Sequence, residues 1–345
     1  MARSSTTYPR KWSSGKTTVI RIPEKMAEEL LQIARRLDTT RSFCIREEPG
    51  ALVLELRQPK SVRYTSGKPV NVSSVPQRSP FRYPGGKTWL VPYIRDWLRS
   101  KSPQPARLIE PFAGGAIVSL TVAFERLAKH VIFSELDEGV ASVWRVILNG
   151  QAEWLARQIL QFNVSLESVR SNLNRPVDDL REKAFQTIIR NRVQRGGIMA
   201  TGAGLVKTGE KGRGLSSRWY PETLARRIRE INRLKDRFTF VEGDGFALIE
   251  EHKADHEAVF YIDPPYTLAA RRLYTKWQID HSRLFALMRE CKGGFLMSYD
   301  NTIEVVALAK KYGFVTHPIA MKNTHHAKMT ELLISNDLSW VQSGA

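Results

Sequence analysis

The chain is poor in cysteine: Cys44 and Cys291 are its two cysteines in 345 residues. They lie far apart and lack the spacing of metal ligands, which argues against a disulfide framework and against a zinc site. The seven histidines do not change this, because the adjacent His325 and His326 would point to opposite faces of a strand. We therefore expect two unpaired thiols, a reducing compartment and no bound metal.

The chain also lacks an apolar run of about 18 residues, the minimum for a membrane-spanning helix. Its N-terminal stretch, MARSSTTYPRKWSSGK, is polar and basic and has no apolar core of a secretory signal. Hydrophobic residues still make up 42% of the chain, an ordinary share for a globular protein with a buried core. We expect a cytoplasmic protein that does not bind membranes.

Acidic residues are scarce relative to basic ones. The chain has 35 Asp and Glu against 53 Lys and Arg, which gives a formal net charge of +18. A surplus of this size indicates a polyanionic partner, and nucleic acid is the commonest one. A basic surface without a specific partner is the alternative, so charge alone does not name an activity.

The composition changes along the first 80 residues. Residues 1–58 contain an alternating stretch at Thr17–Ile22, a helical pattern at Glu24–Leu37 and an apolar strand at Ala51–Leu56. These patterns predict a small α+β accessory element of unassigned role. Residues 59–80 are rich in Pro, Ser and Gly, which is typical of a linker.

From residue 81 onward, strand and helix patterns alternate, which predicts an α/β fold with a parallel, Rossmann-like sheet. Short apolar strands are expected at residues 107–112, 130–136, 239–244, 258–263 and 294–300. An amphipathic helix is expected over residues 116–130. The last two strand patterns, FVTHPIA and ELLISN, have no long helix between them and predict an antiparallel hairpin at one edge of the sheet.

A long insert separates the second and third strands of this pattern. Residues 151–238 are mainly helical in pattern and include a Gly-rich basic stretch from Arg190 to Arg218. Basic side chains separated by glycines suit a backbone that conforms to DNA and grips its phosphates. A solvated loop that orders on binding is the alternative.

The segment EPFAGGA, Glu110–Ala116, follows a predicted strand and opens a helix. Its glycines permit a tight turn and a close approach of the backbone to a ligand. Glu135 ends the next strand, at the spacing where nucleotide-binding folds place an acid for ribose hydroxyls. Neither G-x-G-x-x-G nor a Walker lysine motif is present, so an adenosine-containing ligand other than a dinucleotide or ATP is favoured.

The segment YIDPPY, Tyr261–Tyr266, places Asp263 at the end of a strand, where open α/β sheets bind ligands. Pro264 and Pro265 make the following turn rigid and carry no N–H donors. The Asp263 carboxylate and the Pro264 carbonyl form a pair of acceptors beside the ring of Tyr266. Such a pair suits the exocyclic amine of a planar base.

Three motifs in this order resemble those of the Dam-type, D12 class family of DNA adenine-N6 methyltransferases: FRYPGGK (Phe81–Lys87), EPFAGGA and DPPY. The resemblance covers residues 81–336 and leaves residues 1–80 outside it. It implies a Rossmann-like methyltransferase domain formed by residues 81–150 and 239–340, with residues 151–238 as a target-recognition insert. It also implies S-adenosyl-L-methionine as the cofactor.

The resemblance assigns roles to individual residues. The cofactor-binding set is Tyr83, Lys87, Glu110, Phe112, Gly114, Glu135, Asp244, Phe246 and Asp263. Tyr83 stands where Trp is common in the family, and Glu135 where Asp is more frequent. The catalytic set is Asp263, Pro264, Pro265 and Tyr266. The DNA-binding set, from the insert, is Arg190, Arg192, Arg195, Lys207, Lys211, Arg213 and Arg218.

The implied activity is site-specific transfer of a methyl group from S-adenosylmethionine to N6 of an adenine flipped out of double-stranded DNA. Cytosine-N4 methylation stays open because it also uses an exocyclic amine. A catalytically inactive DNA-binding protein on the same fold is the other alternative. The sequence leaves open the recognition site and whether a cognate restriction endonuclease accompanies the enzyme. We expect a monomer.

Overall fold

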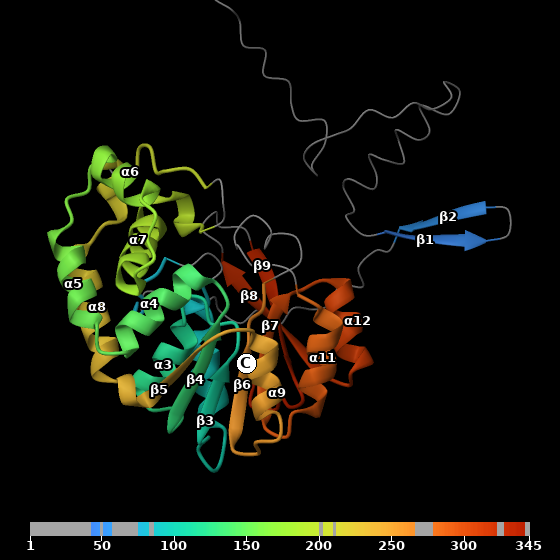
Figure 1. Cartoon of the computed structure of the whole chain (residues 1–345). Helices are drawn as coiled ribbons and strands as arrows, with labels where there is room; N and C mark the ends of the chain where they lie inside the picture. The colour runs from blue at the N-terminus through green and yellow to red at the C-terminus, as the bar shows by residue number, and fades with distance from the viewer. Residues whose placement is uncertain are drawn as a thin grey trace, which may run out of the picture. The chain divides into compact units, whose positions relative to one another are not determined.

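The computed structural model describes residues 43–48, 51–56, 75–82, 86–199, 203–209, 212–265, 279–322 and 328–341. The chain divides into two compact units, Met1–Thr65 and Ser66–Ala345. In the first unit, β1 (Phe43–Glu48) and β2 (Ala51–Leu56) form an antiparallel hairpin (Figure 1). The strand expected at Ala51–Leu56 is confirmed. The strand and helix expected before it, at Thr17–Ile22 and Glu24–Leu37, lie outside the described residues.

A seven-stranded sheet in the order β5-β4-β3-β6-β7-β9-β8 is the centre of the second unit. Its strands are β3 (Arg107–Glu110), β4 (His130–Glu135), β5 (Phe238–Glu242), β6 (Ala258–Ile262), β7 (Gly294–Asp300), β8 (Val315–Lys322) and β9 (Lys328–Ser335). The strands β3 to β7 run parallel, whereas β9 is antiparallel to both of its neighbours. The expected α/β class, parallel sheet and antiparallel edge hairpin are confirmed.

The strand order contains a topological switch point. The chain proceeds outward from β3 through β4 to β5, and then returns to place β6 on the other side of β3. The connections after β3 and β6 therefore leave the sheet in opposite directions, which opens a crevice at the carboxyl ends of these two strands. EPFAGGA follows β3 and DPP follows β6, so the topology brings the two motifs together.

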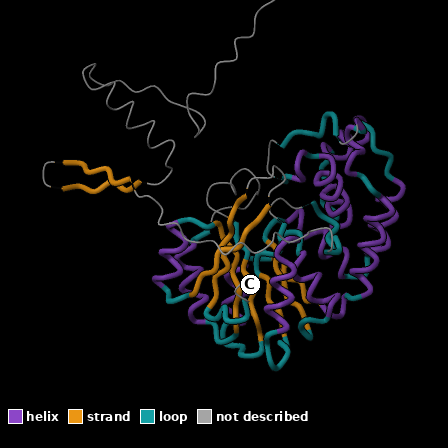
Figure 2. The backbone as a smooth tube through the Cα atoms, turned by 180° about the vertical axis from the view of Figure 1, so that it is seen from behind, coloured by secondary structure: helices purple, strands orange, loops and turns teal. Residues whose placement is uncertain are grey.

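Helices cover both faces of the sheet, as Figure 2 shows with strands in orange between helices in purple. One core contains side chains of α2 (Val91–Arg99), α3 (Ile117–Glu125) and α4 (Glu138–Leu148). The other contains side chains of α9 (Gly245–His252), α11 (His281–Glu290) and α12 (Ile303–Lys311). Strand residues alternate between the cores, and all five residues of β6 are buried, as a central parallel strand requires.

The helix expected over residues 116–130 is shorter than predicted. It ends at Glu125 because Arg126 adopts a left-handed backbone conformation with φ of 53°. Residues Ile117–Ala123 are all buried, so α3 is an interior helix without the exposed stripe of an amphipathic one.

The insert is helical, as predicted, with α5 (Ala152–Gln161), α6 (Leu166–Asn174), α7 (Leu180–Val193) and α8 (Pro221–Arg233). Helix α7 packs against α4, and α5 packs against α8. Side chains of the insert belong to the same hydrophobic core as those of α3 and α4. The insert therefore rests directly on the layer of helices that covers one face of the sheet.

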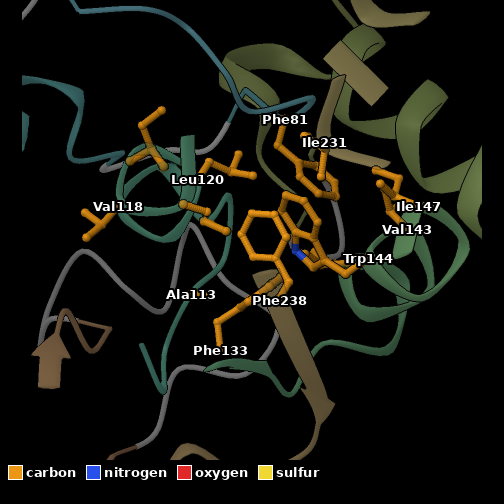
Figure 3. Packing of buried hydrophobic residues seen from close by; sticks show 14 of the residues in the cluster. Phe81, Ala113, Val118, Leu120, Phe133, Val143, Trp144, Ile147, Ile231 and Phe238 are labelled. Carbon is orange, nitrogen blue, oxygen red and sulfur yellow. The ribbon is translucent and has the colours of Figure 1, made fainter. Parts of the chain in front are cut away.

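Trp144 of α4 is a fully buried residue of this shared core. Its ring lies 5.5 Å from that of Phe81 and 5.4 Å from that of Phe133, as centroid distances, and Figure 3 shows the three side chains together. The indole N–H donates to the Gly114 carbonyl at 3.0 Å. The packing of α4 thus fixes one peptide of the EPFAGGA turn.

Asn191, a fully buried residue of α7, ties the insert to the backbone at Arg82. Its side-chain oxygen accepts from the Arg82 backbone N–H at 2.8 Å, and its amide donates to the carbonyls of Arg82 and Gly197, each at 3.0 Å. Gly197 has φ of 75°, and a Cβ there would lie 2.1 Å from the Arg82 oxygen. The side-chain amide therefore pairs with the backbone as a neighbouring strand would.

Replacing Asn191 with Ala should lower the free energy of unfolding by about 1–3 kcal/mol, because it removes the hydrogen bonds that this buried side chain makes to the backbone of Arg82 and Gly197. Urea denaturation followed by circular dichroism measures this change. The control is Asn174→Ala, which changes an exposed asparagine of the same insert and should have little effect. Equal stability of both variants would show that the Asn191 bonds do not hold the backbone at Arg82.

Candidate cofactor and catalytic site

A cavity of about 760 Å³ lies at the carboxyl ends of β3, β4 and β6, at the switch point of the sheet. Ten residues assigned to the cofactor or to catalysis line it: Lys87, Glu110, Phe112, Gly114, Glu135, Asp244, Phe246, Asp263, Pro264 and Pro265. Tyr83 and Tyr266 lie outside the described residues. The structure therefore brings together all the described members of the two sets, and their individual roles stay predictions.

The EPFAGGA turn is held by hydrogen bonds to two neighbouring elements, α3 and β4. The Glu110 carboxylate accepts from the Ser119 backbone N–H in α3 at 2.8 Å. On β4, the Ser134 hydroxyl donates to the Pro111 carbonyl at 2.7 Å, and the Ser134 carbonyl accepts from the Ala113 N–H at 3.1 Å. Gly114 has φ of 50°, a left-handed conformation that glycine adopts without strain. The turn is thus preformed.

Glu110 is a buried carboxylic acid with a raised pKa. Its side chain is 3% exposed, and burial raises its pKa to about 8 in spite of the bonds from Ser119. The Asp263 carboxylate adds repulsion. A cation placed in the cavity beside Glu110 would relieve both effects, because it favours the ionised form of the carboxyl group.

Glu135 bridges two turns at the wall of the cavity. One carboxylate oxygen accepts from the Gly114 N–H at 2.9 Å, and the other accepts from the Asp137 N–H at 2.8 Å. Burial raises the pKa of Glu135 to about 7. Each oxygen keeps a second lone pair, so the group can still accept hydrogen bonds from a pair of hydroxyls.

The aromatic end of the cavity lies where α9 begins. The Asp244 carboxylate accepts from the Phe246 N–H at 3.1 Å, and the rings of Phe246 and Phe112 meet edge to face with centroids 6.0 Å apart. A Cβ on Gly245 would lie 2.6 Å from the Pro111 oxygen, so the two turns are in close contact. The Arg283 guanidinium lies 4.9 Å from the centre of the Phe246 ring. No sequence motif marks Arg283, which reaches the site from α11.

Asp263 belongs to a buried charge cluster, which we define as Lys87, Asp263, Asp300 and Glu331. The Lys87 ammonium lies 3.1 Å from an Asp263 oxygen and 3.6 Å from a Glu331 oxygen. The Ser298 hydroxyl donates to the same Asp263 oxygen at 3.1 Å. Burial alone would lower the pKa of Lys87, but the carboxylates of Asp263 and Glu331 outweigh it and raise that pKa.

Sequence reasoning missed both Ser298 and Glu331. They belong to β7 and β9, and no local pattern marks either residue as part of the site. They reach Asp263 and Lys87 because β7 lies beside β6 and β9 returns antiparallel to β7. Knowledge of the strand order, combined with the polarity of these residues within apolar strands, is the signal that could have identified them.

The basic residues assigned to DNA binding differ in their exposure to solvent. Arg195, Lys207 and Arg213 are exposed, whereas Arg190 and Arg218 are partly buried; Lys211 lies outside the described residues. Arg192 departs from the expected surface position, since its side chain is 5% exposed and donates to the Pro80 carbonyl. Burial and the neighbouring arginines lower its pKa to about 9. Arg192 is therefore a buried residue at the cavity wall, and its role in DNA binding stays a prediction.

Comparison with solved structures finds methyltransferases of low sequence identity and low TM-score. The rRNA methyltransferase AviRa from Streptomyces viridochromogenes is 14% identical, with coverage of 76% of this chain and 90% of that chain and a TM-score of 0.34. The SAM-dependent methyltransferase from Agrobacterium tumefaciens is 9% identical, with coverage of 71% and 59% and a TM-score of 0.32. Among curated proteins, none matches the chain.

The family comparison covers most of the chain. The model of the D12 class N6 adenine-specific DNA methyltransferases matches residues 83–324. This range contains Lys87, the EPFAGGA turn, the insert and the DPP segment, which meet around one cavity. The chain therefore belongs to the D12 class N6 adenine-specific DNA methyltransferase family.

Proposed function

We propose that the cavity holds S-adenosylmethionine along its acidic wall and that Asp263 receives the N6 amine of an adenine flipped out of double-stranded DNA. The observation that carries this proposal is that Asp263 and Pro264 line the same cavity as Glu110, Gly114 and Glu135. The cavity volume of about 760 Å³ lies within the usual range for ligand sites. Its buried carboxylates suit a cofactor that carries positive charge.

Most of the proposed cofactor contacts involve residues that line the cavity. Glu135 accepts hydrogen bonds from the ribose hydroxyls, while Asp244 and Phe246 bind the cofactor's adenine. Glu110, Phe112 and Gly114 form the wall beneath the cofactor. Tyr83 and Lys87 are proposed to contact the methionine end of the cofactor, and Lys87 also pairs with Asp263.

When bound, S-adenosylmethionine supplies the methyl group from its sulfonium sulfur. The Asp263 carboxylate and the Pro264 carbonyl accept hydrogen bonds from the target amine, which draws its lone pair out of conjugation with the purine ring. Pro265 keeps this turn rigid, and Tyr266 stacks on the base. The chain therefore contributes mostly by positioning and electrostatics.

The exposed side chains Arg195, Lys207 and Arg213, with Arg190, Arg218 and Lys211, are proposed to contact DNA phosphates. Among the described residues, no helix is long and apolar enough to cross a membrane. We further propose that the enzyme acts in the cytoplasm, as a monomer, at a specific DNA site.

Transfer of labelled methyl groups to unmethylated DNA, followed by nucleoside mass spectrometry, tests the activity. The wild-type protein should yield N6-methyladenine. Asp263→Ala should reduce kcat by about 10³-fold or more, because the amine loses its charged acceptor, while cofactor binding persists.

The matched control for Asp263→Ala is Asp255→Ala. Asp255 pairs with Arg107 near the amino ends of β3 and β6, whereas Asp263 lies at the carboxyl end of β6. The control variant should keep activity near that of the wild type. If the product is N4-methylcytosine, the target base is cytosine and not adenine. If Asp263→Ala stays active, Asp263 does not have its proposed role.

Cofactor affinity should rise with pH between about 6 and 8. Glu110 and Glu135, with pKa values raised to about 8 and about 7, are partly protonated below those values and must lose protons when a cation binds. Each group contributes up to about tenfold in affinity per pH unit below its pKa. Titration calorimetry in buffers of different ionisation enthalpy measures the protons released. Glu110→Gln should weaken binding and release fewer protons, and an unchanged proton count would exclude Glu110 from this linkage.

Reversing two exposed charges of the insert, as Arg195→Glu with Lys207→Glu, should weaken DNA binding. The slope of log K against log salt should become shallower by about 2 if each residue contacts one phosphate. Fluorescence anisotropy at several salt concentrations measures this slope. The control, Lys310→Glu with Lys311→Glu on the exposed end of α12, makes the same charge change away from the insert. Equal slopes for the two double variants would place the DNA contact elsewhere.

A further inference from the structure

The buried charge cluster contains more negative than positive groups. Asp263 follows β6, Asp300 ends β7, and Glu331 lies opposite Asp300 in the register of β9. Carboxylates from three adjacent strands therefore surround the Lys87 ammonium, which is 3% exposed. One ammonium cannot neutralise three carboxylates, so the cluster favours retention of a proton.

Glu331 is the member of the cluster suited to retain that proton. Its side chain is 6% exposed, and one of its carboxylate oxygens is buried without a hydrogen-bond partner. Burial raises the pKa of Glu331 to about 7, although Lys87 opposes this. The titratable and charged groups that face it among the described residues are Lys87, Asp263, Asp300 and Tyr261. Glu331 thus exchanges a proton near neutral pH.

The protonation state of Glu331 affects how strongly Asp263 accepts hydrogen bonds, because both carboxylates lie beside the Lys87 ammonium. One Asp263 oxygen already receives hydrogen bonds from Ser298 and Lys87, each with a donor–acceptor distance of 3.1 Å. When Glu331 is ionised, it competes for the Lys87 ammonium. When Glu331 is protonated, the full charge of Lys87 acts on Asp263 and weakens its oxygens as acceptors for any further donor.

We propose that Glu331 is a positioning residue for methyl transfer, because its carboxylate shares Lys87 with Asp263 and leaves Asp263 able to accept a hydrogen bond from the target amine. This inference rests on the proposed role of Asp263. Glu331 acts through Lys87, since it is not among the residues that line the cavity. It therefore affects the chemical step more than the binding of cofactor or DNA.

The test is Glu331→Gln, which keeps the shape of the side chain and removes its charge. In the wild type, kcat should rise as pH increases through about 7, because the ionised form of Glu331 is the active one. The variant should show a kcat about ten- to hundredfold lower at pH 8, with KM for cofactor and DNA within about twofold of wild type. Its kcat should be nearly flat between pH 6 and 8.

The matched control is Ser335→Ala, on the same strand. Ser335 is buried and its hydroxyl donates to the Phe295 carbonyl at 2.6 Å, away from the cluster. This variant should lower Tm but keep the wild-type pH profile. Carbon NMR of labelled glutamate carboxyls provides a readout independent of activity, since a resonance that titrates near pH 7 should disappear in Glu331→Gln.

The outcomes distinguish this inference from the proposed function. If the wild type methylates adenine and Asp263→Ala does not, a wild-type pH profile in Glu331→Gln overturns the role of Glu331 alone. The role of Glu331 is also overturned if Ser335→Ala, at a similar loss of Tm, loses as much kcat as Glu331→Gln does. If Asp263→Ala remains active, both proposals fail.

Discussion

The Lys87 ammonium, buried against Asp263 and Glu331, is the interaction on which the site depends. Removing ionised groups from water is costly unless they are paired, so carboxylates gathered at one edge of a sheet need compensation. Here the compensation is incomplete, and burial raises the pKa values of Glu110, Glu135 and Glu331. The site is therefore built to gain stability when a positively charged ligand enters.

Packing outside the cavity positions the backbone segments that carry the site residues. Trp144 packs between the sheet and the insert and donates to Gly114, which fixes the turn after β3. Asn191 holds the backbone at Arg82, five residues before Lys87 in the sequence. Helix α4 thus fixes the EPFAGGA turn, and the insert, which packs against α4, fixes the backbone at Arg82. The helices of the insert are part of the catalytic architecture as well as the proposed carrier of DNA contacts.

The sequence was most informative where structure is local. Continuous apolar strands followed by Gly or Pro turns predicted β3, β6 and the cavity between them, since parallel strands must end at one edge. Glu331 and Ser298 could not be found this way, because their proximity to Asp263 depends on the antiparallel return of β9 and on strand order. The burial of Arg192 was not foreseen, because a basic residue near a Gly-rich stretch resembles a surface residue, whereas α7 is buried on nearly all sides.

The topology also explains why the cavity has walls of opposite charge. The sheet contributes acids at its strand ends, while the insert contributes Arg192 and Arg227, whose guanidinium groups donate to the carbonyls of Pro80 and Ser79. Positive charge is favoured beside the acids and disfavoured beside the arginines. In the proposed reaction, the cationic cofactor suits the sheet side. The phosphodiester backbone suits the insert side, so a neutral base is the part of DNA that can approach Asp263 at the lowest electrostatic cost.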